Sequence, residues 1–545
     1  MNTSSLLFKR APLALALASA LSIVTLSSGA AAAGSTPAAG LAHLTPDERA
    51  ALITDRKASH RVGSHATERA TAWMRSAAHS PADETLWSGD TLTGTVHNVT
   101  NCADSGPGSL RNTVGNADDG DTIDLSSLNC STITLTTGAI VVSQSELSIL
   151  GPGANELSVS GNNNSQIFAH TGSSLTIDGL TIADGFKYSA SDDARGGCIF
   201  STGTVDIENT IIRDCLVATV RPQDAALGGA LYASRVTLTD SVIQGNNAQN
   251  KYESTCGLDA CIAAGGGVFA QNALSLRNSL VIDNHAFSQN GSSLGGGVFI
   301  PGPASGEFVS KYSSFEQNSA LLSGAIASNT NSLLTGTSIV MNQAGRAAGG
   351  ILGGDGRVTR VHNSTVSSNI STDSQSPALV CAGLVVRGES SVTASTIAFN
   401  VAEAGGGDDE DVVGGLCSDG DLRLESTILA NNFAGATPSD LEIDDGAVTG
   451  ADNLVMASMA NVPEGTLVGV EPRLGSLALR GARTWNHAPK GFSVVIDRGN
   501  TAGGGDFDQR GEGYARIVGA AADIGSIELD DLIFAHDFEL PIQSP

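Results

Sequence analysis

The residues with the clearest potential for chemistry lie in the stretch ADGFKYSASDDARGG, at positions 183–197. They are Asp184, Lys187, Asp192, Asp193 and Arg195. Lysis of a uronate polysaccharide needs clustered carboxylates for calcium and an Arg or Lys base, whereas glycoside hydrolysis needs paired carboxylates across the scissile bond. Such charges should come from neighbouring repeats of a fold, but these five share one loop region. Polysaccharide lyase or glycoside hydrolase activity is therefore the alternative function, and we predict no catalytic residue.

Metal and nucleotide motifs are weak in this chain. Asp408, Asp409 and Asp411, in GGGDDEDVV, could offer oxygen ligands to calcium, but the run lacks the alternating D-x-D-x-D-G pattern and a solvated acidic turn is favoured. GSSLG around Ser293 lacks the strand-to-helix context of a nucleophile elbow. The sequence has no H-E-x-x-H, no P-loop and no doubled C-x-x-C. Apart from a possible calcium ion, no cofactor is predicted.

Composition limits the fold and the partners. The chain has 545 residues, of which 65 are glycine, and only 4% are aromatic. This balance is typical of a turn-rich, repetitive β architecture. Acidic side chains outnumber basic ones by 56 to 29, so that the net charge is −27 and nucleic acid is not an expected partner.

A short window ending in asparagine recurs eight times. With Ser241 of VTLTDSVIQGNN as the first position, a hydroxyl residue begins each window, an apolar residue follows two positions later, and asparagine follows five positions later in seven windows. The hydroxyl column is Thr210, Ser241, Ser279, Ser313, Thr337, Ser364, Ser395 and Ser426. The asparagine column is Asn246, Asn284, Asn318, Asn342, Asn369, Asn400 and Asn431, with Cys215 in the first window.

A strand that begins with small residues, mostly glycine, precedes each window, as in GGALY and GGGVF, and an aliphatic residue stands two positions after its second glycine. Successive second glycines are 25 to 37 residues apart, a period typical of a solenoid. Alternating β-branched residues punctuated by Gly and Asn indicate strands rather than paired helices. The prediction is an all-β fold, a right-handed parallel β-helix with a short helical N-terminal extension.

The two recurrent polar positions have structural explanations. Asparagine tolerates the left-handed conformation that a coil corner needs, and its amide can donate and accept along a stack. We therefore interpret the asparagine column as an architectural ladder rather than a ligand site. Glycine at the other corner allows tight turning.

Variation in coil length indicates where a partner could bind. Insertions fall mainly between each asparagine and the next glycine, on one side of the predicted rod, and variable loops of repeat proteins often form the binding face. The binding candidates in these loops are Arg221, Asp224, Lys251, Tyr252 and Glu253. The predicted partner is an extracellular carbohydrate or protein surface.

The N-terminus resembles an export signal. Lys9 and Arg10 precede an apolar run to Leu26, and Ala30 to Ala33 offer cleavage sites, so we expect residues 1–33 to be removed rather than to anchor the chain. No transmembrane span is expected after this removal. Residues 34–97 form the helical, loosely packed extension.

Export allows disulfides, and the eight cysteines form an even set. Nearness in sequence favours Cys102 with Cys130, Cys198 with Cys215, and Cys256 with Cys261, which leaves Cys381 with Cys417.

Two stretches carry a family resemblance. Residues 98 to about 153, with CADSGPGSLRNTVGNADDGDTIDL, STITLTTGAIVV and LSILGPG, resemble the opening of bacterial right-handed β-helix proteins related to polymorphic outer membrane proteins. EPRLGSLAL, DQRG and ADIGSIEL, near the end, resemble a choice-of-anchor Q domain. The chain departs from that domain at APKGFSVVIDRGN, where the family reads closer to L-P-G-S-P-A-I-D-x-G-N.

The resemblance implies a protein that is secreted or held at the outer surface of a bacterial cell, and it supplies no catalytic residues. We expect a β-helix with an N-terminal cap over residues 98–435, a Q-like C-terminal cap over 436–529 and a tail over 530–545. Leu110, Val114 and Ala117, at helical spacing, suit the N-terminal cap. The expected function is adhesin-like binding through the loops, without catalysis.

Overall fold

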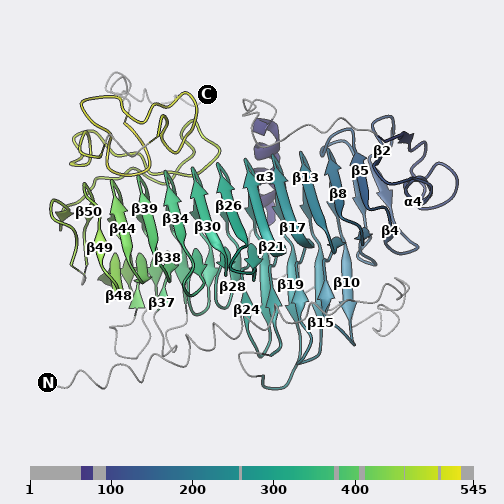
Figure 1. Ribbon diagram of the computed structural model, residues 1–545, viewed down its shortest axis with the longest axis horizontal. Helices are drawn as coiled ribbons and strands as arrows, with labels where there is room; N and C mark the ends of the chain where they lie inside the picture. The colour runs from purple at the N-terminus through teal and green to yellow at the C-terminus, as the bar shows by residue number, and fades with distance from the viewer. Residues whose placement is uncertain are drawn as a thin grey trace, which may run out of the picture.

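The computed structural model describes residues 63–77, 94–256, 260–372, 380–403, 412–458, 461–500 and 505–529. These residues form an all-β solenoid in which each coil stacks in register on the one before, so the predicted parallel β-helix is confirmed (Figure 1). The predicted signal sequence, Asp408, Asp409 and Asp411 lie outside the described residues. The stack continues past residue 435, where we expected it to end.

Sheet A has 22 strands, because most coils contribute two segments to it. Its strands are β1 (Val96–Asn98), β2 (Asp121–Asp124), β4 (Ile140–Val142), β5 (Glu146–Leu150), β7 (Phe168–His170), β8 (Ser174–Asp178), β12 (Ile199–Ser201), β13 (Thr204–Glu208), β17 (Leu231–Thr239), β21 (Val268–Arg277), β25 (Val298–Ile300), β26 (Glu307–Lys311), β29 (Ile326–Ser328), β30 (Asn331–Thr335), β33 (Ile351–Gly353), β34 (Thr359–His362), β38 (Leu384–Val386), β39 (Ser390–Thr393), β43 (Leu416–Asp419), β44 (Leu422–Glu425), β48 (Leu441–Asp445) and β49 (Val448–Thr449).

Sheet B has one strand from each coil. Its strands are β3 (Thr132–Thr134), β6 (Ser158–Ser160), β9 (Thr181–Ala183), β14 (Ile211–Arg213), β18 (Val242–Gln244), β22 (Leu280–Ile282), β27 (Ser314–Glu316), β31 (Ser338–Val340), β35 (Thr365–Ser367), β40 (Thr396–Ala398), β45 (Ile428–Ala430), β50 (Leu454–Val455) and β51 (Leu467–Val468).

Sheet C begins later in the stack and has ten strands. They are β10 (Phe186–Ser189), β15 (Leu216–Thr219), β19 (Asn247–Asn250), β23 (His285–Ser288), β28 (Ser319–Ala320), β32 (Gln343–Ala344), β36 (Ile370–Ser371), β41 (Val401–Ala402), β46 (Phe433–Ala434) and β47 (Thr437–Pro438). The small sheets are sheet D, with β11 (Ala194–Arg195), β16 (Ala226–Leu227), β20 (Ala263–Ala264) and β24 (Ser293–Leu294), and the pair β37 (Val380–Cys381) with β42 (Val412–Val413).

The interior is a column of aliphatic side chains that the sheets enclose. Ile212, Ile243, Val281 and Phe315 from sheet B are fully buried and meet the inward residues of sheet A. Helix α4 (Leu110–Gly115) closes the first coil with Leu110 and Val114, as expected for an N-terminal cap. Gln144 donates from Nε2 to the carbonyls of Val114 and Ala117, which satisfies the end of this short helix.

The asparagine column forms the predicted ladder. Asn284 is fully buried, and its Oδ1 accepts from both the backbone N–H and the Nδ2 of Asn246, at 3.1 and 2.9 Å. The same pattern links Asn318, Asn342, Asn369 and Asn400 in turn. Each amide therefore satisfies buried groups of the neighbouring coil at the corner between sheets B and C.

The assignment of Asn431 to the ladder was wrong. Asn432 is the fully buried rung that accepts from Asn400, and Asn431 precedes it with a φ of 60°. Each ladder position follows a left-handed residue, such as Asp214 or Asp283, so the corner conformation belongs to the preceding residue. The ladder asparagines are needed for their amides rather than for a left-handed backbone.

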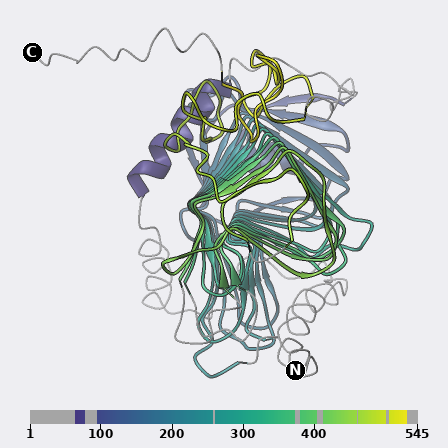
Figure 2. The ribbon, with the colours of Figure 1, turned by 90° about the vertical axis from the view of Figure 1, so that its left-hand side faces the viewer.

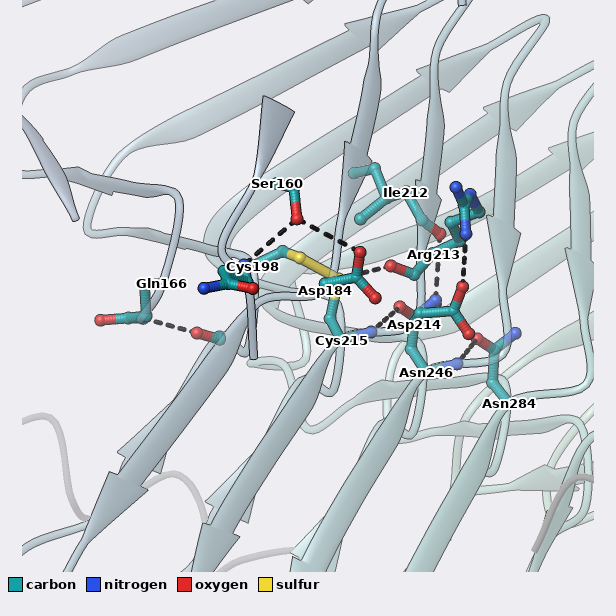
Figure 3. Close-up of a disulfide and its surroundings, with 12 residues drawn as sticks. Ser160, Gln166, Asp184, Cys198, Ile212, Arg213, Asp214, Cys215, Asn246 and Asn284 are labelled. Carbon is teal, nitrogen blue, oxygen red and sulfur yellow. Dashed lines mark hydrogen bonds and ion pairs between the residues drawn. A yellow bond between two sulfur atoms is a disulfide. The ribbon is translucent and has the colours of Figure 1, made fainter. Parts of the chain in front are cut away.

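At both ends of the ladder, a residue other than asparagine takes the terminal position. Cys215 takes the first rung, where its N–H donates to Asn246 Oδ1 at 3.0 Å and its sulfur is bonded to Cys198 (Figure 3). At the other end, Asn432 donates to the carboxylate of Asp440, at 2.7 Å. Burial raises the pKa of Asp440, although hydrogen bonds from Asn432 and Ala457 oppose that rise. The structure also forms the other three predicted disulfides.

Glycine is required at the opposite corner for two reasons. Gly228 has a φ of 70°, which residues with a side chain rarely adopt. A Cβ on Gly229 would clash with the carbonyl oxygen of Gly266 in the next coil. The glycine pair thus provides both the turn and the close approach between coils.

Two segments cover the outer face of sheet B. Helix α3 (Gly63–Ala77) packs Ala66, Ala70 and Trp73 against β14, β18 and β22, so the described part of the extension is firmly docked rather than loosely packed (Figure 2). Residues 472–500 and 505–529, here called the C-terminal strap, run along the same sheet instead of capping the last coil (Figure 1). Outward apolar residues such as Ile428 and Leu454 explain this position, because the strap removes them from water.

The strap contains a buried charged cluster that makes stability depend on pH. Burial raises the pKa of Glu528 from 4.5 to about 7, although Val518 and Asp523 donate backbone hydrogen bonds to its carboxylate. The folded protein holds this proton more tightly than the unfolded chain does. Between these pKa values folding takes up a proton, so this group's contribution to stability falls as pH rises.

We therefore expect the free energy of unfolding of the wild type, relative to Glu528→Gln, to fall by about 2 kcal/mol between pH 5 and pH 8. Comparing the two proteins removes the effect of titrating groups that do not interact with Glu528. Urea unfolding curves at several pH values measure the difference. A difference that does not change with pH would contradict the prediction.

Candidate functional site

The predicted loop residues come together in a side lobe that projects from the rod (Figures 1 and 2). The side lobe consists of β10, β11, β15, β16, β19, β20, β23 and β24, and its two sheets pack through small residues such as Ala226, Ala248 and Ala263. Its other side covers a stack of aromatic rings on the outer face of sheet A, formed by Phe200, Tyr232, Phe269 and Phe299.

Within the side lobe, charges weighed for the alternative catalytic function meet binding candidates on the adjacent coil. Asp193 forms an ion pair with Arg195 at 2.9 Å and accepts from the N–H of Ala225 at 2.8 Å. Arg221 lies 3.3 Å from the carboxylate of Asp224 and donates to the carbonyl of Ala190. These charges therefore bind one another and the neighbouring loops.

The third binding loop is also held by internal contacts. The ammonium of Lys251 lies 4.7 Å from the centre of the Phe287 ring. Asn290 donates from Nδ2 to the carbonyls of Tyr252 and Glu253, at 3.0 and 2.8 Å. The structure thus brings the five predicted binding residues into one region, where these contacts shape the loops.

Two charged groups of the side lobe have shifted pKa values. Burial lowers the pKa of Lys187, with Asp192 opposing the shift, and burial raises the pKa of Asp224, with Arg221 opposing it. Asp184 lies apart from this group, at the corner beside the Cys198–Cys215 disulfide, where it accepts from Ser160 at 3.2 Å (Figure 3).

A second group of charges, which sequence reasoning missed, lies on the outer face of sheet A. Val205 and Ile207 of β13 point into the core, so Asp206 and Glu208 point outward. Glu208 is in register with Asp178 of β8, which places their Cα atoms about 4.8 Å apart. We call Asp178, Asp206 and Glu208 the acidic strip.

The pKa values of two carboxyl groups in the acidic strip are raised. Both outward carboxyl groups of β13 are half-buried. Burial raises the pKa of Asp206, against hydrogen bonds from Thr237 and Ser174. Burial also raises the pKa of Glu208, and the charges of Asp178, Asp206 and Asp240 add to the rise while Arg277 opposes it. Burial and neighbouring negative charge thus favour the protonated form of these carboxyl groups more than water does.

Catalytic charges on a β-helix are expected to come from neighbouring coils, and those of the acidic strip do, because β8 and β13 belong to adjacent coils. The stretch TVDIE alternates apolar and polar residues, and the acidic positions follow from that alternation once the strand is recognised. The five residues at 184–195 do not meet the condition by themselves. In the part of the chain that the structure describes, no three His, Cys, Asp or Glu side chains group as a metal site.

Comparisons with known proteins identify no family. No family model matches the chain, and no curated protein is similar to it. A solved structure with a similar course of the chain is that of the pectate lyase Pel9A, at 13% identity and a TM-score of 0.35. The match covers 80% of this chain and 96% of that one. This likeness concerns the parallel β-helix fold alone.

Proposed function

We propose that the protein is an exported β-helix that binds an extracellular polysaccharide along the acidic strip of sheet A. The observation that carries the proposal is the pair of half-buried carboxyl groups, Asp206 and Glu208, on one outward strand face beside Asp178. Four disulfides support the export that the signal-like N-terminus predicts. Within the described residues, no helix is both long and apolar enough to cross a membrane.

An extended sugar polymer suits this surface. Carboxyl groups, together with hydroxyls such as Thr176 and Thr237 in the same outward column as Asp206, match the hydroxyl groups of a sugar chain. The protein's net charge of −27 and the acidic strip itself repel anionic chains. The expected ligand is therefore a neutral polysaccharide.

We expect the double substitution Asp206→Asn, Glu208→Gln to weaken binding of a neutral polysaccharide at least about tenfold, equivalent to about 1.4 kcal/mol. Both changes keep the side-chain size but remove the acidic acceptors. A carbohydrate array identifies the ligand, and calorimetry then measures its affinity.

Glu307→Gln is the matched control, because Glu307 is exposed on the same outward face, in β26. It is expected to leave affinity unchanged. Loss of binding only on combined replacement of Lys251, Tyr252 and Glu253 would instead assign recognition to the side lobe, as expected from the insertions.

The raised pKa of Glu208 favours glycoside hydrolysis as a second candidate function. A protonated Glu208 would donate to the leaving oxygen, and Asp206, about 7 Å away at Cα on the same strand face, would activate a water or attack the sugar. Release of reducing ends that disappears in Glu208→Gln supports this candidate. Unsaturated products, detected by their absorbance, would indicate lyase chemistry instead.

A further inference from the structure

Helix α3 and the C-terminal strap contact each other as well as sheet B. The guanidinium of Arg69 donates to Glu316 of β27 at 2.8 Å and to the carbonyl oxygen of Arg483 in the strap at 2.6 Å. Arg69 and Glu316 are 9% and 2% exposed. One buried side chain of α3 thus bonds the rod and the strap at once.

Aromatic rings complete the junction. Arg69 lies 4.9 Å from the Trp73 ring centre and 5.6 Å from that of Trp485, so it stands near a ring from each segment. Arg483 lies 5.8 Å from the Trp73 ring and forms an ion pair with Asp240 of the rod at 2.9 Å. The two segments therefore share cations and rings that neither would bury alone.

We propose that α3 and the strap form one cooperative clasp across sheet B, in which each segment is held in place by the docking of the other. The reason is that undocking either segment leaves part of the junction exposed or unpaired. Without the strap, Arg69 loses the Arg483 carbonyl and the Trp485 ring. Without α3, Glu316 loses its buried cation and Arg483 loses the Trp73 ring.

The clasp joins two segments that lie far apart in the sequence. Residues 69 and 483 are 414 positions apart, and they meet only because both segments lie on the same sheet. The strap is further fixed by Ser338 of β31, which accepts from the N–H of Trp485 at 3.2 Å.

Hydrogen exchange on the full-length protein tests the proposal, with the variants Arg69→Ala and Trp485→Ala. We expect each variant to raise exchange at least about tenfold both in α3 and in the strap around residues 484–487, while the ladder amides of Asn246 and Asn318 stay protected. Arg75→Ala is the matched control, because Arg75 is an exposed arginine of the same helix that forms no ion pair with another residue in the described part of the chain. It should leave exchange unchanged.

Three outcomes would overturn the proposal. Faster exchange confined to the segment that carries the substitution would show independent docking. Faster exchange at the ladder amides as well would show that both segments are integral to the rod. Arg75→Ala matching Arg69→Ala would show a general effect of charge on the helix. Because exchange is measured without a ligand, these outcomes are independent of the proposed polysaccharide binding.

Discussion

Replacing Asn369 with alanine is expected to lower the free energy of unfolding by about 3 kcal/mol. Its Oδ1 accepts from the backbone N–H and the Nδ2 of Asn342, and its Nδ2 donates to Asn400 and to the carbonyl oxygen of Ile339. All of these groups are buried, so no water replaces the missing partner. Each unpaired group costs about 1 to 3 kcal/mol, and the neighbouring bonds recover part of that cost. Chemical denaturation measures the loss.

Asn431 provides the matched control for this ladder residue. It precedes the true rung with a φ of 60°, and glycine accepts that conformation without strain. We expect Asn431→Gly to change stability by less than about 0.5 kcal/mol. Equal losses at the two positions would show that the ladder bonds of Asn369 contribute no more than the side chain of a residue outside the ladder, and would contradict the prediction.

The architecture was predictable because its residues repeat. The ladder, the glycine corner and the inward aliphatic residues recur in each coil, so their roles can be inferred from the pattern alone. The single register error arose where residue types are doubled: Ser426 precedes Thr427, Ile428 precedes Leu429, and Asn431 precedes Asn432. Strand pairing places Leu429 beside Ile397 in the core, which moves the whole window by one residue.

It was harder to predict that α3 and the strap cover the outer face of sheet B, although the sequence of the strands indicates that this face is covered. The strands that contain Ile211, Val242 and Leu280 are apolar on both faces, which is typical of a parallel sheet that is covered on its outer side. The identity of the covering segments could not be inferred, because α3 and the strap lack the repeat and meet residues hundreds of positions away.

The ladder could be predicted because its residues recur, and the acidic strip was missed because its residues do not. Outward residues of a solenoid are free to differ between coils, so Asp206 and Glu208 are not part of a residue pattern that recurs along the stack. The binding site was predicted instead in the polar insertions. In the side lobe, many of these polar groups contact the neighbouring loops. A search for carboxylates at outward strand positions of adjacent coils would have found the acidic strip.

Replacing Glu316 with alanine is expected to have the largest effect on the docking of α3, with a loss of about 3 to 5 kcal/mol, because it leaves the Arg69 cation buried without its anion. If α3 is held by less than this amount, the helix undocks and the loss in global stability stops at its docking energy. Denaturation curves for the protein and exchange in α3 then report the two quantities separately.

The paired substitution Arg69→Met, Glu316→Leu tests whether the charges themselves stabilise this junction. It removes both desolvated ions and keeps apolar volume beside Trp73 and Trp485, so we expect a loss of no more than about 1 to 2 kcal/mol. The double variant should therefore be more stable than Glu316→Ala. If it is less stable, the bonds from Arg69 to Glu316 and to the strap contribute more than burial of the two ions costs, and the ion pair is a net source of stability.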